Sequence, residues 1–225
     1  MKNYHQIVDA DGTLRPALPV VLAHAQQGHS MLLIGGFDVG LMSMARAVCN
    51  GLPPLTSVEL ERVNMARQAA KLGPADMRPF RAPHYTCSDA ALLGTSKNPY
   101  GGELHLARHG VLLLDQVVEF RKSVLTATME AVRVGQTKYP RADGAVLCAE
   151  VYPQVVIGTA PPCSCGKLNT QHGLALCSCS KDDVLAYQNR LEASAKHFAV
   201  RLEISLDWSA LVHGEREEAS ERRSP

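Results

Sequence analysis

Long apolar segments are absent from this sequence of 225 residues, and none of its apolar runs approaches the roughly 20 residues that a membrane-spanning helix requires. The amino terminus is polar over residues 1–5 and lacks the apolar core of a secretion signal. Excess charge is absent too, because 23 lysines and arginines balance 22 acidic residues and leave a formal net charge of +1. Such a chain has no global attraction to nucleic acid or to a membrane surface, although a local basic face is compatible with it. We therefore expect a cytoplasmic protein without a membrane partner.

A disulfide framework is not expected either. In the reducing cytoplasm the seven cysteines should stay reduced, so their spacing matters more than their number. Apolar residues are plentiful by contrast, since 46% of the chain is hydrophobic, and this is enough for a sizeable core. We predict one domain over residues 1–213, followed by a charged and disordered tail at 214–225.

The order of apolar runs and turn residues predicts an α/β fold. Short apolar runs predict strands at residues 31–34, 111–114, 154–157 and 201–206. Apolar periodicity, caps and glycine stops predict helices at 14–25, 41–49, 56–72, 122–134 and 180–190, and a short one after Ser88. Residues 136–149 predict a β-hairpin that turns at Asp143 and Gly144. Strands that alternate with helices in this way indicate a mostly parallel sheet covered on both faces.

A glycine loop lies between the first apolar strand and the next helix, and its glycines are Gly35, Gly36 and Gly40. In this position, backbone N–H groups can point at a phosphate. A working phosphate loop continues with lysine and then serine or threonine, but here those positions hold Leu41 and Met42. Asp38 also places a carboxylate near the phosphate oxygens. An ordinary turn is the alternative, because two glycines after a strand are common in turns.

Four blocks of sequence carry a wider resemblance: residues 78–94 (RPFRAPHYTCSDAALLG), 101–120 (GGELHLARHGVLLLDQVVEF), 162–166 (PCSCG) and 177–179 (CSC). With these blocks the chain resembles, over about residues 10–212, the magnesium-chelatase-like AAA+ domain of the ComM and YifB type. It is more distantly similar to the ATPase subunit of magnesium chelatase. The resemblance implies a three-layer P-loop NTPase fold with β-hairpin insertions that assembles into rings and places ATP between subunits. In the ComM-like members it implies a ring that acts on DNA.

The resemblance also implies which residues of this chain stand at the family's functional positions. The lysine that reaches the terminal phosphates and the hydroxyl that holds Mg²⁺ fall on Leu41 and Met42, neither of which can replace them. The acidic pair after the second strand falls on Asp115 and Gln116. Asp115 keeps the carboxylate on the metal side, or serves as a capping or salt-bridged group of the scaffold. Gln116 can position water but cannot take its proton.

Two further family positions are changed in this chain. The asparagine that senses the terminal phosphate falls on Pro161, which has no side-chain donor or acceptor. The arginine that reaches across the subunit interface falls near His197, where an imidazole replaces a permanent cation. A shifted alignment is the alternative at each position. The chain also ends soon after its last strand, which leaves little of the small helical domain that usually closes over the nucleotide.

These changes predict a degenerate AAA+ module that binds ATP and Mg²⁺ weakly or not at all. Such a pseudo-ATPase would act as an assembly or regulatory subunit, with copies of itself or with related AAA+ subunits as partners. Two other functions stay open at this point. One is an ATP-binding motor that acts on DNA with an unorthodox phosphate loop. The other is a nucleic-acid-binding module that has kept a basic surface without the motor.

Two cysteine pairs, Cys163 with Cys165 and Cys177 with Cys179, could surround a tetrahedral zinc ion. Each pair is separated by one residue, whereas two separating residues are the usual spacing in zinc sites. His172 could replace one thiolate. The alternative is four free cysteines in a loop. The sequence therefore makes zinc a candidate cofactor at this loop.

A basic region makes DNA a candidate partner, and its cations are Arg62, Arg67, Lys71, Arg78, Arg81, Lys97 and Arg108. In a ring such residues could line a pore and contact a nucleic-acid backbone. The alternative is an ordinary solvated face, because acidic residues at 59, 61 and 76 interrupt the region.

Overall fold

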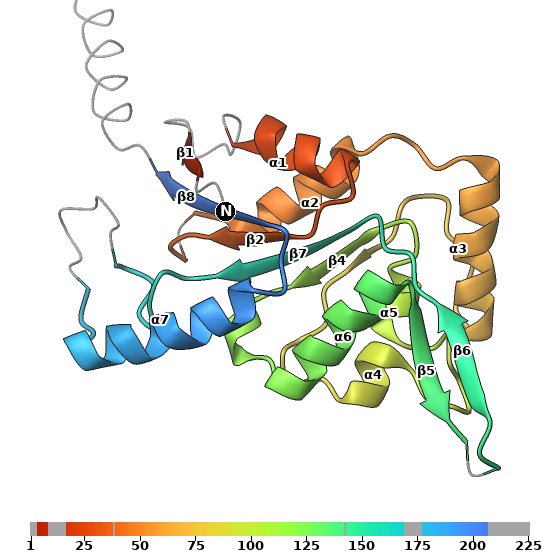
Figure 1. Ribbon diagram of the computed structural model, residues 1–225. Helices are drawn as coiled ribbons and strands as arrows, with labels where there is room; N and C mark the ends of the chain where they lie inside the picture. Colours follow the sequence, from red (N-terminus) through yellow and green to blue (C-terminus); the bar gives the residue numbers. More distant parts are fainter. Residues whose placement is uncertain (1–3, 9–16, 38, 142, 169–176, 207–225) are drawn as a thin grey trace, which may run out of the picture.

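A parallel sheet of six strands lies at the centre of the computed structural model (Figure 1). The structure describes residues 4–8, 17–37, 39–141, 143–168 and 177–206, so Asp38, His172 and the predicted tail at 214–225 lie outside the described residues. Each strand runs parallel to its neighbours. The strands follow the order β1 (Tyr4–Val8), β8 (Val200–Leu206), β2 (Met31–Ile34), β7 (Val155–Ala160), β4 (Val111–Leu114) and β3 (Phe80–Arg81).

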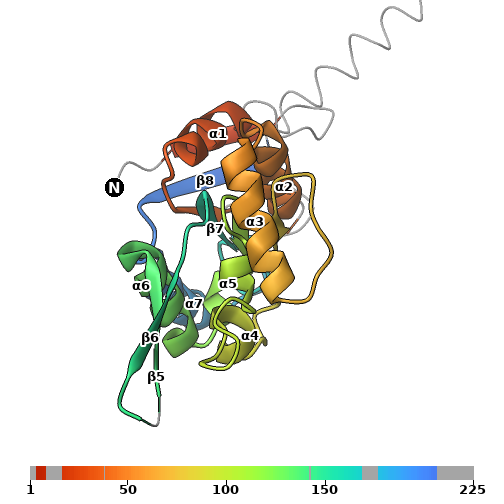
Figure 2. The same ribbon diagram turned by 90° about the vertical axis from the view of Figure 1, so that its right-hand side faces the viewer.

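Helices cover both faces of this sheet (Figures 1 and 2). One apolar core contains Met31 and Leu33 of β2 and is closed by α1 (Leu18–Gln26) and α2 (Leu41–Gly51). The other contains Leu32 and Ile34, and α6 (Lys122–Val134) and α7 (Lys181–Ala195) close it. Successive side chains of a strand point to opposite faces, so a strand buried on both sides is apolar throughout. The predicted α/β fold is confirmed, and it is a P-loop NTPase-like fold.

Local capping signals define several helix ends. Helix α3 (Ser57–Ala69) begins at Thr56, whose side chain accepts from the Glu59 amide while the Glu59 carboxylate accepts from the Thr56 amide. Helix α6 stops at Gly135, which adopts φ +77°. Helix α7 continues past its predicted end at residue 190, because Leu191 still faces the core. None of the helices in the described ranges has the length and apolarity needed to cross a membrane.

Several short elements were not predicted from the sequence. Strand β1 pairs with β8 at the edge of the sheet, where Tyr4 lies opposite Leu202. The 3₁₀ turn at Val117–Glu119 and α5 (Glu103–Leu106) were not predicted either, whereas α4 (Asp89–Leu93) is the short helix predicted after Ser88. Single turns of this length have too few residues to show a period.

The predicted β-hairpin is formed by β5 (Gln136–Pro140) and β6 (Val146–Glu150), and it projects away from the sheet (Figures 1 and 2). Its base is held by the buried imidazole of His105 in α5. The ring nitrogen Nε2 lies 3.1 Å from the Thr137 hydroxyl and 3.2 Å from the Tyr139 hydroxyl. The Nδ1 atom lies 3.2 Å from the carbonyl of Glu150. One neutral ring thus ties both hairpin strands to the body of the domain.

We expect the hairpin to loosen in mild acid. Burial lowers the pKa of His105 below its usual 6.5, and nearby Arg108 lowers it further. A histidine whose pKa is lower in the folded state stabilises the fold fully above the unfolded value of 6.5, and this contribution falls as the pH drops below it. Hydrogen exchange at pH 7.5 and pH 5.5 should show faster exchange of hairpin amides at the lower pH, after correction for the intrinsic rate. Replacement of His105 by Gln should flatten this pH dependence, whereas an unchanged slope would contradict the assignment.

Candidate functional site

The motif positions after three strands meet at one edge of the sheet. Strands β2, β7 and β4 are neighbours and parallel, so their carboxyl ends lie side by side. The glycine loop follows β2, Asp115 and Gln116 follow β4, and Pro161 follows β7. The carboxyl edge of a parallel sheet is where α/β proteins bind their ligands. The structure therefore brings most of the predicted site residues to the position where a nucleotide site would lie.

The glycines of the loop have roles in the fold itself. A Cβ atom added to Gly35 would lie 2.7 Å from the carbonyl oxygen of Ile204, so only glycine fits beside β8. The amide of Gly35 donates to the carbonyl of Ala160 at 3.1 Å. Gly40 precedes α2 with φ +72°, a left-handed conformation that favours glycine. Gly35 and Gly40 are therefore explained without a bound phosphate.

The two residues after the loop point in different directions. Leu41 is buried at 8% exposure and packs in the core beneath α1 and α2. A methyl carbon of Leu41 would lie 3.4 Å from a Cβ at Gly35, so the side chain fills space under the loop. Met42 is 45% exposed. Neither side chain offers a cation or a hydroxyl to a phosphate or a metal ion.

Asp115 takes part in a hydrogen-bond network with β7. The hydroxyl of Thr159 donates to its carboxylate at 2.5 Å, and the same hydroxyl accepts from the amide of Gln116 at 3.1 Å. Gln116 adopts φ +54°, which is uncommon for a residue other than glycine. Sequence reasoning missed Thr159, although a single hydroxyl in the apolar strand 155–160 was a usable signal. The network gives Asp115 a structural partner within the chain.

Pro161 and His197 lie at opposite edges of the sheet. Pro161 is buried directly after the carboxyl end of β7. His197 follows α7 and precedes β8, so it lies near the edge where the parallel strands begin. Its amide donates to the carbonyl of Ser194 at 3.2 Å. Within one copy, His197 is therefore separate from the other predicted site residues.

The four predicted cysteines form a compact cluster. Their sulfur atoms all lie within 4.8 Å of one another, and the distance between Cys163 and Cys165 is 3.4 Å. Cys177 lies 3.7 Å from Cys163 and 3.5 Å from Cys165. Four thiolates bound to zinc at about 2.3 Å would be about 3.8 Å apart in a tetrahedron. Within the described ranges this is the one group of His, Cys, Asp and Glu side chains that could hold a metal ion.

Backbone amides support a negative charge on one sulfur of this cluster, while burial and hydrogen bonds between the thiols raise the pKa of Cys177 and Cys179. The amides of Lys167 and Ser178 donate to the sulfur of Cys165 and lower its pKa to about 5. Because the thiolate is the form that binds a metal, these amides prepare Cys165 as a ligand. The spacing of these cysteines in the sequence indicated a metal site, and in the structure their sulfur atoms lie close together.

Most of the predicted basic region has partners inside the chain. Arg81 forms a two-pronged ion pair with Glu103, with distances of 2.5 and 2.6 Å. The remaining intramolecular partners are carbonyl groups for Arg67 and Arg78, and Glu150 for Arg108. Exposed cations of the region are Arg62, Lys71 and Lys97. The region thus contributes much of its hydrogen bonding to the fold.

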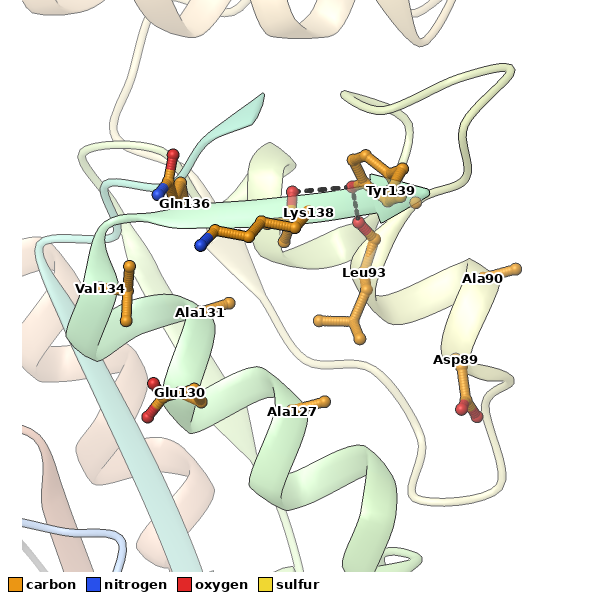
Figure 3. A pocket seen from close by; sticks show the side chains of 12 residues that line it. Asp89, Ala90, Leu93, Ala127, Glu130, Ala131, Val134, Gln136, Lys138 and Tyr139 are labelled. Carbon is orange, nitrogen blue, oxygen red and sulfur yellow. Dashed lines mark hydrogen bonds between the residues drawn. The ribbon is translucent and has the colours of Figure 1, made fainter. Parts of the chain in front are cut away.

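A separate open groove of about 480 Å³ lies between α4, α6 and β5, and Figure 3 shows its lining. Its lining includes the apolar residues Ala90, Ala127 and Ala131 and the charged residues Glu130 and Lys138. The Tyr139 hydroxyl donates to the carbonyl of Leu93 on one side of the groove. None of the predicted site residues lines this groove.

Comparison with known proteins agrees with the sequence resemblance. A family model described as magnesium chelatase, subunit ChlI, matches residues 8–215. The uncharacterized protein YifB of Salmonella typhimurium is 31% identical over 192 residues, which covers 81% of this chain and 35% of that protein. The competence protein ComM of Haemophilus influenzae is 26% identical over 225 residues, which covers 98% of this chain and 42% of that protein. The chain therefore spans about a third to two fifths of the length of these relatives.

A solved structure supports the fold at greater distance. The chain is similar to NtrX from Brucella abortus in complex with ATP, with a TM-score of 0.50 and 15% sequence identity. The match covers 89% of this chain and 39% of that one. At this identity the likeness extends to the fold alone.

Proposed function

Because this chain belongs to the magnesium chelatase subunit ChlI family, we propose that it is a degenerate AAA+ module. In this role it hydrolyses ATP poorly or not at all and acts as an assembly or regulatory subunit. Its partners are copies of itself or related AAA+ subunits. The proposal concerns the module that the family shares, since the chain matches only part of its longer relatives.

The observation that carries this proposal is the burial of Leu41. A phosphate loop works through a lysine that reaches from the first turn of the helix to the terminal phosphates. Here the side chain at that position turns into the core and leaves the loop without a cation. The charge of a triphosphate then has no permanent counter-charge at this position, and Met42 supplies no hydroxyl for Mg²⁺. The residues at the loop do not fit a bound ATP–Mg²⁺ complex.

The changes at Gln116 and Pro161 support the same function. A water molecule that attacks phosphate must be positioned and relieved of its proton, and an amide lacks the basicity for the second task. Proline offers no side-chain hydrogen bond to a phosphate. Asp115 already accepts from Thr159, so its carboxylate has a structural role without a metal.

We expect nucleotide not to control assembly. In the related rings ATP lies between neighbours, and a cation from one subunit recognises its terminal phosphate. This chain has Leu41 at the phosphate loop and His197 near the position of the interface cation. A triphosphate between two copies would therefore receive little charge stabilisation. A ligand without differential affinity for free and assembled chains cannot shift that equilibrium. Sedimentation velocity with and without ATP and Mg²⁺ should give the same distribution of masses, and a shift toward a hexamer on ATP addition would overturn the proposal.

The second candidate function is an ATP-binding motor that acts on DNA with an unorthodox loop. The observation in its favour is the start of α2, where Gly40 provides no side-chain cap and the first amides can face an anion. Calorimetry with ATP and Mg²⁺ distinguishes the two functions. Binding in the micromolar range would favour the motor, and a steep salt dependence of DNA binding would test its substrate.

We infer that the four-cysteine cluster binds one zinc ion with a structural role. The short distances between the sulfur atoms and the amides that donate to Cys165 support this inference. Cys163 and Cys165 follow β7, and Cys177 and Cys179 precede α7, so the ion would hold the two ends of the connecting segment together. Four reduced thiolates also favour the cytoplasm as the compartment.

A further inference from the structure

The cysteine cluster and the glycine loop touch each other through one aromatic ring. Phe37 in the loop lies against Gly166, which directly follows Cys165. A Cβ atom added to Gly166 would lie 2.4 Å from Cδ2 and 2.7 Å from Cε2 of Phe37. The ring thus rests on the bare Cα of the glycine. These two segments lie far apart in the sequence, so the contact depends on the tertiary fold.

The conformation of Gly166 depends on the cluster. It adopts φ +76°, and its amide donates to the carbonyl of Cys163 at 2.9 Å. This turn brings the sulfur of Cys165 to the sulfur of Cys163. A metal ion that holds both thiolates would therefore fix the backbone turn on which the ring of Phe37 rests.

Phe37 lies at the surface of the domain rather than in its core. Its side chain is 63% exposed, whereas Val39 on the same loop is buried in the core. If the turn at Gly166 were lost, the glycine loop would lose the contact between Gly166 and the ring of Phe37.

We propose that metal binding at the four cysteines controls the conformation of the glycine loop, with the contact between Phe37 and Gly166 as the coupling element. The proposal rests on the zinc site inferred above. When the ion is bound, the turn at Gly166 is rigid and the loop is held. When it leaves, the turn relaxes and the loop opens. Because coupling is reciprocal, Phe37 also strengthens metal binding.

Hydrogen–deuterium exchange of the wild-type chain tests the first half of the coupling. Elemental analysis should first establish about one zinc per chain as purified, and a chelator should then remove it. We expect amides of residues 35–40 to exchange faster after zinc removal, while those of α3 remain unchanged. Helix α3 is the matched control because it lies on the opposite side of the domain from the end of β7 and the start of α7, the two elements that flank the cysteines (Figure 1).

Three outcomes would overturn the proposal in distinguishable ways. Absence of zinc would remove the metal site and with it the coupling. Zinc with unchanged exchange of the loop would remove the coupling and leave the metal site intact. Faster exchange in the loop and in α3 alike would mean that the ion supports the whole fold rather than the loop.

The zinc affinity of a Phe37 variant tests whether the loop in turn strengthens metal binding. Replacement of Phe37 by Ala should weaken zinc binding by about fivefold or more in competition with a coloured chelator, the lower end of usual coupling. Replacement of Met42 by Ala is the matched control, since Met42 is exposed near the same loop and has no place in the contact with Gly166. Equal zinc affinities of the two variants would overturn the proposal.

Discussion

Purified protein should hydrolyse ATP in the presence of Mg²⁺ no faster than a protein-free background. Phosphoryl transfer relies on positioning and on charge stabilisation, and each missing element commonly reduces the rate by orders of magnitude. On the proposed function, Leu41, Met42 and Gln116 stand at the positions of the phosphate cation, the metal hydroxyl and the base. A coupled assay of phosphate release measures the result. Robust turnover that disappears when Asp115 is replaced by Ala would contradict the proposed function.

Restoring the loop should recover binding before it recovers rate. The double replacement of Leu41 by Lys and Met42 by Thr returns a cation and a hydroxyl, so ATP affinity should rise. Turnover should stay near background because Gln116 still lacks basicity. The lysine must leave the core that Leu41 fills, so we expect a stability loss of about 2 to 3 kcal/mol from that replacement. Replacement of Met42 by Thr alone is the control, since Met42 is half exposed and should change stability little.

Replacement of Cys163 and Cys165 by Ser should abolish zinc binding and lower the melting temperature. The wild-type chain should carry about one zinc ion, measured by native mass spectrometry or elemental analysis. Structural zinc contributes directly to folding free energy. A loss of about 3 kcal/mol or more would lower the melting temperature of a chain of this size by roughly 6 to 12 °C. The ion would hold together the two ends of the segment between β7 and α7, where the cysteines lie.

Replacement of Cys148 by Ser is the control for this experiment. Cys148 is exposed on the hairpin and lies outside the cluster, so its loss should change neither zinc content nor melting temperature. A wild-type chain that is free of metal, folded and indifferent to chelator would favour four free thiols instead.

Several residues at the proposed nucleotide site have roles in the fold itself. Gly35 is required by the close approach of β8, and Gly40 by its positive φ. Asp115 has Thr159 as a partner. On the proposed function, Leu41 stands at a position whose family side chain would serve a nucleotide, and here it packs in the core instead. We infer that loss of catalysis can leave such a scaffold stable, because the ligand-binding side chains contribute little to its core.

Much of this fold could be predicted from local sequence. The buried strands 31–34 and 111–114 are visible as short apolar runs, and the start of α3 is visible in the spacing of Thr56 and Glu59. The stop of α6 is visible as Gly135, a glycine directly after the helical pattern. In each case the interaction that creates the element joins residues a few positions apart, so the sequence shows it directly.

The arrangement of the site depended on contacts between distant parts of the chain. The pairing of β1 with β8, the bond from Thr159 to Asp115 and the contact of Phe37 with Gly166 all join residues separated by long stretches of sequence. The sequence named the four cysteines, but their mutual distances depend on how β7 and α7 place the two pairs. Strand order decides these contacts, because it determines which loops share an edge of the sheet, and no local pattern of residues encodes that order.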